Sequence, residues 1–144
     1  MTTKGFTLIE LLVVIAIIGI LSTIGILTFA GFTETSAQKA AENSLSAMTL
    51  SQQEYKSNQG QYFSTGGTSG ACTPTAATTT AIIGSSTVTS TPGLFGGTDN
   101  LTGQRYYFCS TGDSSSYTLT AKHTSKTCQI TLTNFNIINR TNCD

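Results

Sequence analysis

Residues 4–21 read KGFTLIELLVVIAIIGIL, and this stretch decides the fold. It opens an apolar run from Phe6 to Phe32 in which Glu10 is the only charged side chain. As an α-helix the run would cover roughly 40 Å, more than the ~30 Å hydrocarbon core of a bilayer. A carboxylate inside such a run costs roughly 2.5–3.5 kcal/mol at the bilayer centre, so Glu10 is a candidate functional residue.

The residues before the run form a short leader whose only charge is Lys4. A positive charge on the short side of a membrane segment predicts that residues 1–5 stay cytoplasmic and the rest of the chain is exported. A cleaved secretory signal would have a shorter apolar core followed by a small-x-small site, which this sequence lacks. The sequence therefore predicts a retained transmembrane helix over residues 6–32.

A second helical pattern follows the apolar run. Five apolar residues recur on one stripe with the 3.6-residue period of an α-helix: Ala37, Ala41, Leu45, Met48 and Tyr55. Because no proline interrupts residues 6–57, we expect one continuous helix of roughly 78 Å, with Gly60 as its stop. Its amphipathic part, residues 33–58, belongs to a globular head that comprises residues 33–144.

The head continues with a loop and a small sheet. Residues 60–104 are rich in Ser, Thr and Gly, and AIIG (81–84) and TVT (87–89) are candidates for a short strand. Three segments rich in β-branched and aromatic residues then predict an antiparallel meander over residues 105–133: RYYFCS (105–110), SYTLTA (116–121) and CQITLT (128–133). Residues 134–144 are left as a tail. The predicted fold class is α+β, a long N-terminal helix whose hydrophobic half protrudes and whose amphipathic half packs on the sheet.

Composition limits the classes of function. The 144 residues include seven basic and seven acidic side chains, so no net charge favours nucleic acid as a partner. The sequence has one histidine, no C-x-x-C pair, no nucleophile elbow and no phosphate-binding glycine loop. We therefore expect no enzyme, no cofactor and no metal site.

The stretch KGFTLIELLVVIAIIGIL resembles the N terminus of a type IV prepilin, the family that includes type IV pilus subunits and the pseudopilins of type II secretion. The resemblance is dense over residues 4–22, and G-F-T-L-I-E is its most specific part. The strand sequences also resemble the sheet of type IVa-like pilins. The resemblance implies that a prepilin peptidase cuts between Gly5 and Phe6 and that the new amine of Phe6 is N-methylated.

This chain departs from the family in the second half of the apolar run. Members often carry a proline there, where this sequence has Leu27, while Gly19 and Gly25 remain. The two glycines favour either local melting of the helix or close helix packing, and the sequence leaves both interpretations open.

The resemblance implies a structural subunit of an extracellular type IV pilus, which polymerises through its N-terminal helix for adhesion, motility or DNA uptake. The Glu10 carboxylate would face the Phe6 amine of a neighbouring subunit, since a buried charge is tolerated when it is paired. Implied partners are identical or related pilin subunits, the prepilin peptidase and an inner-membrane assembly platform, with a single-pass precursor in the inner membrane. The alternatives are a pseudopilin, or a DNA-binding competence (minor) pilin that contacts DNA through Lys122, Lys126 and Arg140.

The even number of cysteines, four, favours disulfides in an exported chain. The resemblance implies a carboxy-terminal disulfide loop over residues 128–143, which corresponds to Cys128–Cys143 and would tie down the tail. Cys72–Cys109 is then the expected second pair, joining the loop to the first strand. The sequence alone leaves two other connectivities open: Cys72–Cys128 with Cys109–Cys143, and Cys72–Cys143 with Cys109–Cys128.

Overall fold

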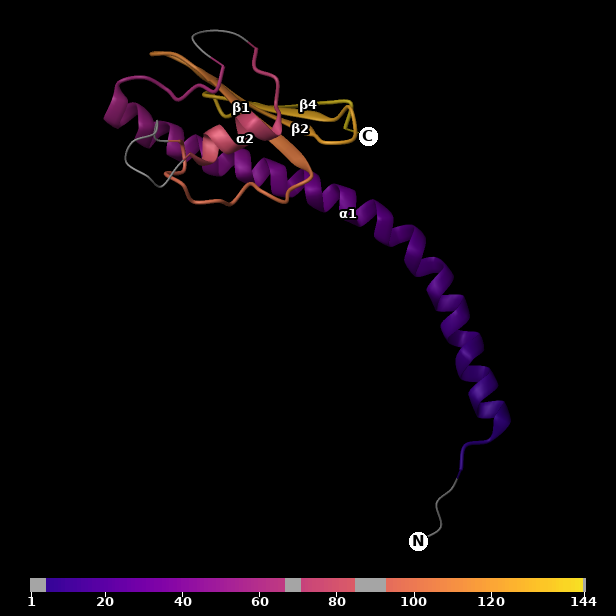
Figure 1. Cartoon of the computed structure of the whole chain (residues 1–144). Helices are drawn as coiled ribbons and strands as arrows, with labels where there is room; N and C mark the ends of the chain where they lie inside the picture. Colours follow the sequence, from indigo (N-terminus) through magenta and orange to yellow (C-terminus); the bar gives the residue numbers. More distant parts are fainter. Residues whose placement is uncertain (1–4, 67–70, 85–92, 144) are drawn as a thin grey trace. The chain divides into compact units, whose positions relative to one another are not determined.

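A computed structural model describes residues 5–66, 71–84 and 93–143, without the side chains of residues 25–30. The fold is α+β, a long N-terminal helix followed by a short helix and one sheet (Figure 1). By its internal contacts the chain divides into two compact units, Met1–Ser36 and Ala37–Asp144. Its elements are α1 (Leu8–Gln59), α2 (Ala76–Ile83), β1 (Tyr106–Gly112), β2 (Tyr117–His123), β3 (Gln129–Thr133) and β4 (Ile138–Thr141).

Helix α1 is one continuous α-helix of 52 residues. It ends where the sequence predicted, because Gly60 adopts φ +76° and donates its N–H to the Lys56 carbonyl at 2.8 Å. Its backbone passes through Gly19 and Gly25 without a break. A Cβ built on Gly19 would meet no atom within 4 Å, so nothing in the described chain packs closely against this glycine.

The predicted stripe forms the helical side of the core in the second unit. Ala41, Leu45 and Met48 are fully buried, while Ala37 and Tyr55 are half-buried beside them. They pack with apolar side chains from alternate positions of the strands, among them Phe108, Leu119, Ala121, Ile130 and Leu132. The interpretation of the stripe as core is therefore confirmed.

The four strands form one antiparallel sheet in the order β1-β2-β3-β4. The sequence predicted the first three, but the tail over residues 134–144 is not outside the sheet, because residues 138–141 pair with β3. The reversal between β3 and β4 contains Asn136 at φ +59°, a conformation that asparagine tolerates better than most residues. The segment INRT has little apolar character, so its pairing was not visible in the hydrophobic pattern.

The expected loop over residues 60–104 contains helix α2. The predicted strand at AIIG (81–84) is wrong, because Ile82 and Ile83 are the buried last turn of this helix. Thr75 and Thr78 cap its start reciprocally: the Thr78 N–H donates to the Thr75 hydroxyl at 3.2 Å, and the Thr75 N–H donates to the Thr78 hydroxyl at 2.8 Å. The other candidate strand, residues 87–89, lies outside the described residues.

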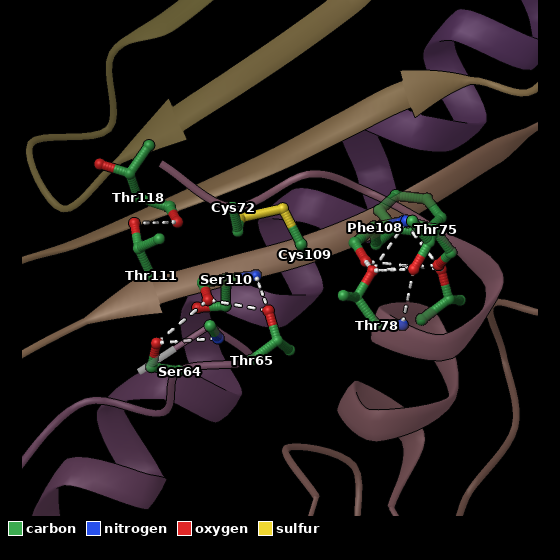
Figure 2. The surroundings of a disulfide bond; sticks show 12 residues. Ser64, Thr65, Cys72, Thr75, Thr78, Phe108, Cys109, Ser110, Thr111 and Thr118 are labelled. Atoms are coloured by element: carbon green, nitrogen blue, oxygen red, sulfur yellow. Dashed lines mark hydrogen bonds between the residues drawn. A yellow bond between two sulfur atoms is a disulfide. The ribbon is translucent and has the colours of Figure 1, made fainter. Parts of the chain in front are cut away.

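Threonines that follow α1 cover the outer edge of β1 (Figure 2). The Thr79 hydroxyl accepts from the Phe108 N–H at 2.8 Å, and the Thr78 hydroxyl donates to the Phe108 carbonyl at 2.7 Å. Nearby, the Thr65 N–H donates to the Ser110 carbonyl at 2.8 Å. These contacts satisfy backbone groups of an edge strand that would otherwise be open to pairing with another chain.

Gln52 is a polar residue on the core stripe, four positions after Met48, and it is fully buried. Its amide nitrogen donates to the Phe63 carbonyl at 3.0 Å and to the Ser110 hydroxyl at 2.7 Å. Its amide oxygen accepts from the Phe63 N–H at 2.8 Å. One side chain thereby joins α1, the segment after it and β1. Gln52 was not predicted as a core residue, because it is polar and the stripe was defined by apolar residues alone.

Candidate assembly site

The predicted cleavage junction lies immediately before helix α1. Gly5, Phe6 and Thr7 are non-helical and exposed, with Phe6 88% exposed. A cut after Gly5 would therefore act on accessible backbone and leave the helix itself intact.

Glu10 closes a reciprocal cap at the start of α1. Its Oε2 accepts from the Thr7 N–H at 2.8 Å and from the Thr7 hydroxyl at 2.7 Å. In return, the Glu10 N–H donates to the Thr7 hydroxyl at 3.3 Å. This capping box satisfies backbone N–H donors that the start of a helix leaves without a partner. Its signature, T-x-x-E, is present in the sequence, but the cap was not predicted from it.

The cap uses only one of the two oxygens of the Glu10 carboxylate. Both contacts from Thr7 go to Oε2, and the described residues provide no hydrogen bond to Oε1. The negative charge also lies in the first turn of the helix, where the helix dipole favours it. The carboxylate can thus cap its own helix and still accept a bond from a group outside the chain.

The helix beyond Glu10 presents apolar side chains on all sides. Every described side chain from Leu8 to Ile24 is exposed. The polar side chains are satisfied within the helix, since the Ser22 hydroxyl donates to the Ile18 carbonyl at 2.7 Å and the Thr23 hydroxyl to the Ile20 carbonyl at 2.7 Å. A helix that is apolar all round requires an apolar environment, and the described residues of this chain do not supply one.

In the described part of the chain, no helix combines the length and the apolar character that crossing a membrane requires.

The structure contains two disulfides. Cys72 is bonded to Cys109, with Cα atoms 6.0 Å apart, and Cys128 to Cys143, with Cα atoms 4.3 Å apart. The first joins the segment before α2 to β1 (Figure 2), and the second joins the start of β3 to the residues after β4. These are the connectivities that we expected, and the alternatives are not formed.

The three cations proposed for DNA contact are not gathered on one face of the sheet. Lys122 is exposed in β2 and pairs in register with Gln129, whose partner in β4 is Thr141. Arg140 is the neighbour of Thr141 in β4, so it belongs to the opposite face. Lys126 is exposed in the turn between β2 and β3.

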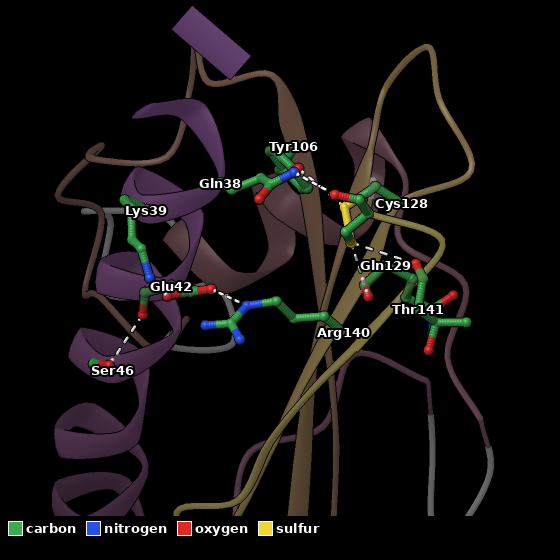
Figure 3. Close-up of polar contacts among 10 residues, drawn as sticks. Gln38, Lys39, Glu42, Ser46, Tyr106, Cys128, Gln129, Arg140 and Thr141 are labelled. Carbon is green, nitrogen blue, oxygen red and sulfur yellow. Dashed lines mark hydrogen bonds and ion pairs between the residues drawn. A yellow bond between two sulfur atoms is a disulfide. The ribbon is translucent and has the colours of Figure 1, made fainter. Parts of the chain in front are cut away.

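Arg140 instead joins β4 to helix α1 through an ion pair with Glu42, which we call the clasp (Figure 3). Its Nε lies 2.5 Å from Oε1 of Glu42, whose Oε2 lies 2.9 Å from the Lys39 ammonium. The Gln38 amide nitrogen also donates to the Cys143 carbonyl at 2.9 Å. The hydrogen bond from Arg140 is the main cause that lowers the pKa of Glu42, while burial of the carboxylate acts in the opposite direction.

This clasp makes the stability of the second unit depend on pH. Because the pKa of Glu42 is lower in the folded chain than its ordinary 4.5, the contribution is fully present above that value and is lost as pH falls through the lower folded-state pKa. We expect Arg140→Gln to reduce the fall in unfolding free energy between neutral and acidic pH. Denaturant unfolding at a series of pH values measures this pH dependence of the unfolding free energy. Lys122→Gln removes an exposed cation outside the clasp and serves as the control; an equal change in both variants would contradict the assignment.

Comparison with known proteins agrees with the N-terminal features. Residues 1–26 match the family described as the prokaryotic N-terminal methylation motif. A stretch of 59 residues is 44% identical to the type IV major pilin protein PilA of Myxococcus xanthus (strain DK1622) and covers 41% of this chain. The chain spans about a quarter of that relative, since the match covers 27% of it. No solved structure matches the chain.

A long N-terminal helix followed by a four-stranded antiparallel sheet is a pilin-like α+β fold. The N-terminal methylation motif and the similarity to a major pilin over part of its length support a resemblance to type IV pilins.

Proposed function

We propose that this protein is processed between Gly5 and Phe6, N-methylated at Phe6, and polymerised through α1 into an extracellular type IV pilus. The observation that carries the proposal is the exposed apolar surface of α1 between Leu8 and Ile24. Before assembly, lipid would cover this surface over the predicted anchor, residues 6–32. In the filament, the same surface of neighbouring copies would cover it.

The Glu10 carboxylate gives this assembly a register. After processing, the Phe6 amine is a positive charge in apolar surroundings, where an unpaired charge costs several kcal/mol. Oε1 of Glu10 is not used by the cap with Thr7 and is the group that would accept this amine from a neighbouring copy. Apolar contact alone is insensitive to sliding of one helix along another, whereas a charge pair is satisfied in few registers.

The prepilin peptidase and an inner-membrane assembly platform are the further partners in this proposal. The precursor would be a single-pass protein of the inner membrane, and the head would be displayed outside the cell. A filament of this kind serves adhesion, motility or DNA uptake. The proposal rests on the N-terminal motif, on the similarity to a major pilin and on the uncovered helix.

Gly5→Arg tests the processing step. A long charged side chain next to the scissile bond is expected to block the cut, so the precursor should accumulate in the membrane and filaments should be absent. Mass spectrometry of the N-terminal peptide distinguishes the uncut chain from one that begins with methylated Phe6. Thr3→Arg adds the same charge away from the junction and should be cut normally. Filaments of Gly5→Arg with a mature N terminus would refute the proposed processing.

A further inference from the structure

A groove of about 470 Å³ lies in the second unit, on the face of the sheet opposite the hydrophobic core. Ala71 and Cys72 form one wall, and the Cys72–Cys109 disulfide fixes that wall to β1. Figure 2 shows this disulfide above the sheet, with Thr111 and Thr118 on the neighbouring strands β1 and β2. Neither the assembly proposal nor the comparisons assign a role to this groove.

Hydrogen-bonding side chains from two strands line the floor of the groove: Thr118, Thr120, Gln129 and Thr131. They belong to one face because they occupy alternate positions of β2 and β3, and the register places Thr120 directly opposite Thr131. Thr120 is only 6% exposed, since Cys109 is its partner on the other side.

Within residues 5–66, 71–84 and 93–143, the fold does not use the hydroxyls and the amide of the floor. In the part of the chain that is described, the side chains of Thr118, Thr120, Gln129 and Thr131 make no hydrogen bond. By contrast, the hydroxyls of Thr65, Thr78 and Thr79 all form hydrogen bonds to backbone groups of β1. The floor thus combines unused donors and acceptors on a rigid support.

The groove offers no uncommitted charge to a ligand. Asp113, at one end, is the ionic side chain among its lining residues. Its Oδ1 already accepts from the Ser115 N–H at 2.6 Å, the Ser115 hydroxyl at 2.8 Å and the Ser116 N–H at 2.8 Å. These bonds commit the carboxylate to the turn between β1 and β2. A ligand of the groove is therefore matched by hydroxyls and an amide, and not by ion pairing.

We propose that this groove binds a neutral saccharide of one or two rings. A polyhydroxylated, uncharged molecule supplies donors and acceptors that can pair with the unused hydroxyls and amide of the floor. The volume falls in the range of roughly 300–1,000 Å³ that is usual for small-molecule sites. The sheet and the disulfide hold the groove in shape before binding, so little ordering is required of the protein.

The test uses the full-length protein in a zwitterionic detergent without sugar head groups. Lactose, cellobiose and N,N′-diacetylchitobiose are titrated while amide NMR signals are followed. We expect saturable shifts at Thr118, Thr120, Gln129 and Thr131, with a dissociation constant on the order of 1 mM for at least one sugar. Glucosamine and glucuronic acid serve as charged comparisons and should bind no better.

Matched variants locate the binding. Thr120→Val with Thr131→Val removes two floor hydroxyls with little change in shape and should weaken binding by about tenfold. Thr133→Val removes a hydroxyl from the same face of β3 but outside the groove and should leave the affinity unchanged. The absence of saturable binding to all three neutral sugars, preferential binding of a charged sugar, or full affinity in the double variant would each overturn the proposal. Because the solubilised chain is used, filament assembly does not affect the result.

Discussion

Replacing Glu10 by alanine is expected to leave the chain in the membrane fraction while filament assembly is lost or strongly reduced. The anchor becomes more apolar, so insertion is not impaired, whereas the Phe6 amine of the neighbouring subunit loses its counter-charge. Glu10→Asp keeps the charge on a shorter side chain and should be intermediate. Immunoblots of membrane and sheared-surface fractions, with electron microscopy, measure both outcomes.

Two further variants separate the charge of Glu10 from its cap with Thr7. Glutamine also closes a capping box, so Glu10→Gln keeps the cap and removes the charge. Thr7→Val keeps the charge and removes the hydroxyl of the cap, which costs about 0.5–2 kcal/mol of helix stability. We expect Glu10→Gln to assemble as poorly as Glu10→Ala, and Thr7→Val to assemble. The reverse pattern would mean that Glu10 acts in assembly only by starting the helix.

The largest loss of stability is expected from Gln52→Ala. The variant leaves the Phe63 N–H without its partner in the core and opens a cavity, for a combined cost of about 3 kcal/mol. Gln52→Leu fills most of the space but restores no hydrogen bond, so it should recover only the packing part. Urea unfolding of the full-length chain in detergent measures the effect, by fluorescence of its five tyrosines, since the chain has no tryptophan.

The neighbouring Gln53 provides the control for this prediction. It is exposed on the same helix, and Gln53→Ala should change the unfolding free energy by less than about 0.5 kcal/mol. If Gln52→Ala were no more destabilising than Gln53→Ala, the buried hydrogen bonds of Gln52 would contribute nothing measurable to the fold.

The sequence predicted those elements whose cause is local or periodic. The 3.6-residue stripe located the core face of α1, and a single glycine, Gly60, located its end. Three strands followed from runs of β-branched and aromatic residues. Each of these features, a helix face, a helix end or a strand, is determined by residues close together in the sequence and does not depend on distant parts of the chain.

The parts that were missed depend on contacts between distant residues or on polar residues in unexpected roles. Strand β4 is held by pairing with β3 and by the contact of Arg140 with Glu42, which lie 98 residues apart in sequence. Gln52 fits the stripe only if a buried amide is allowed in the core. At the N terminus, the pattern T-x-x-E is typical of a helix cap formed by Thr7 and Glu10. The cap was not predicted, because Glu10 was interpreted only as a charge in apolar surroundings.

The most direct test of the central claim, that Glu10 of one subunit pairs with the Phe6 amine of another, uses filaments assembled from two labelled populations. Subunits with ¹⁵N-phenylalanine are mixed with subunits with ¹³C-glutamate, so that magnetisation transfer between the two labels in solid-state NMR arises only between copies. The account predicts a cross-peak between the Phe6 amine nitrogen and the Glu10 carboxyl carbon, as expected for an ion pair within about 4 Å. Well-ordered filaments without this cross-peak would contradict it.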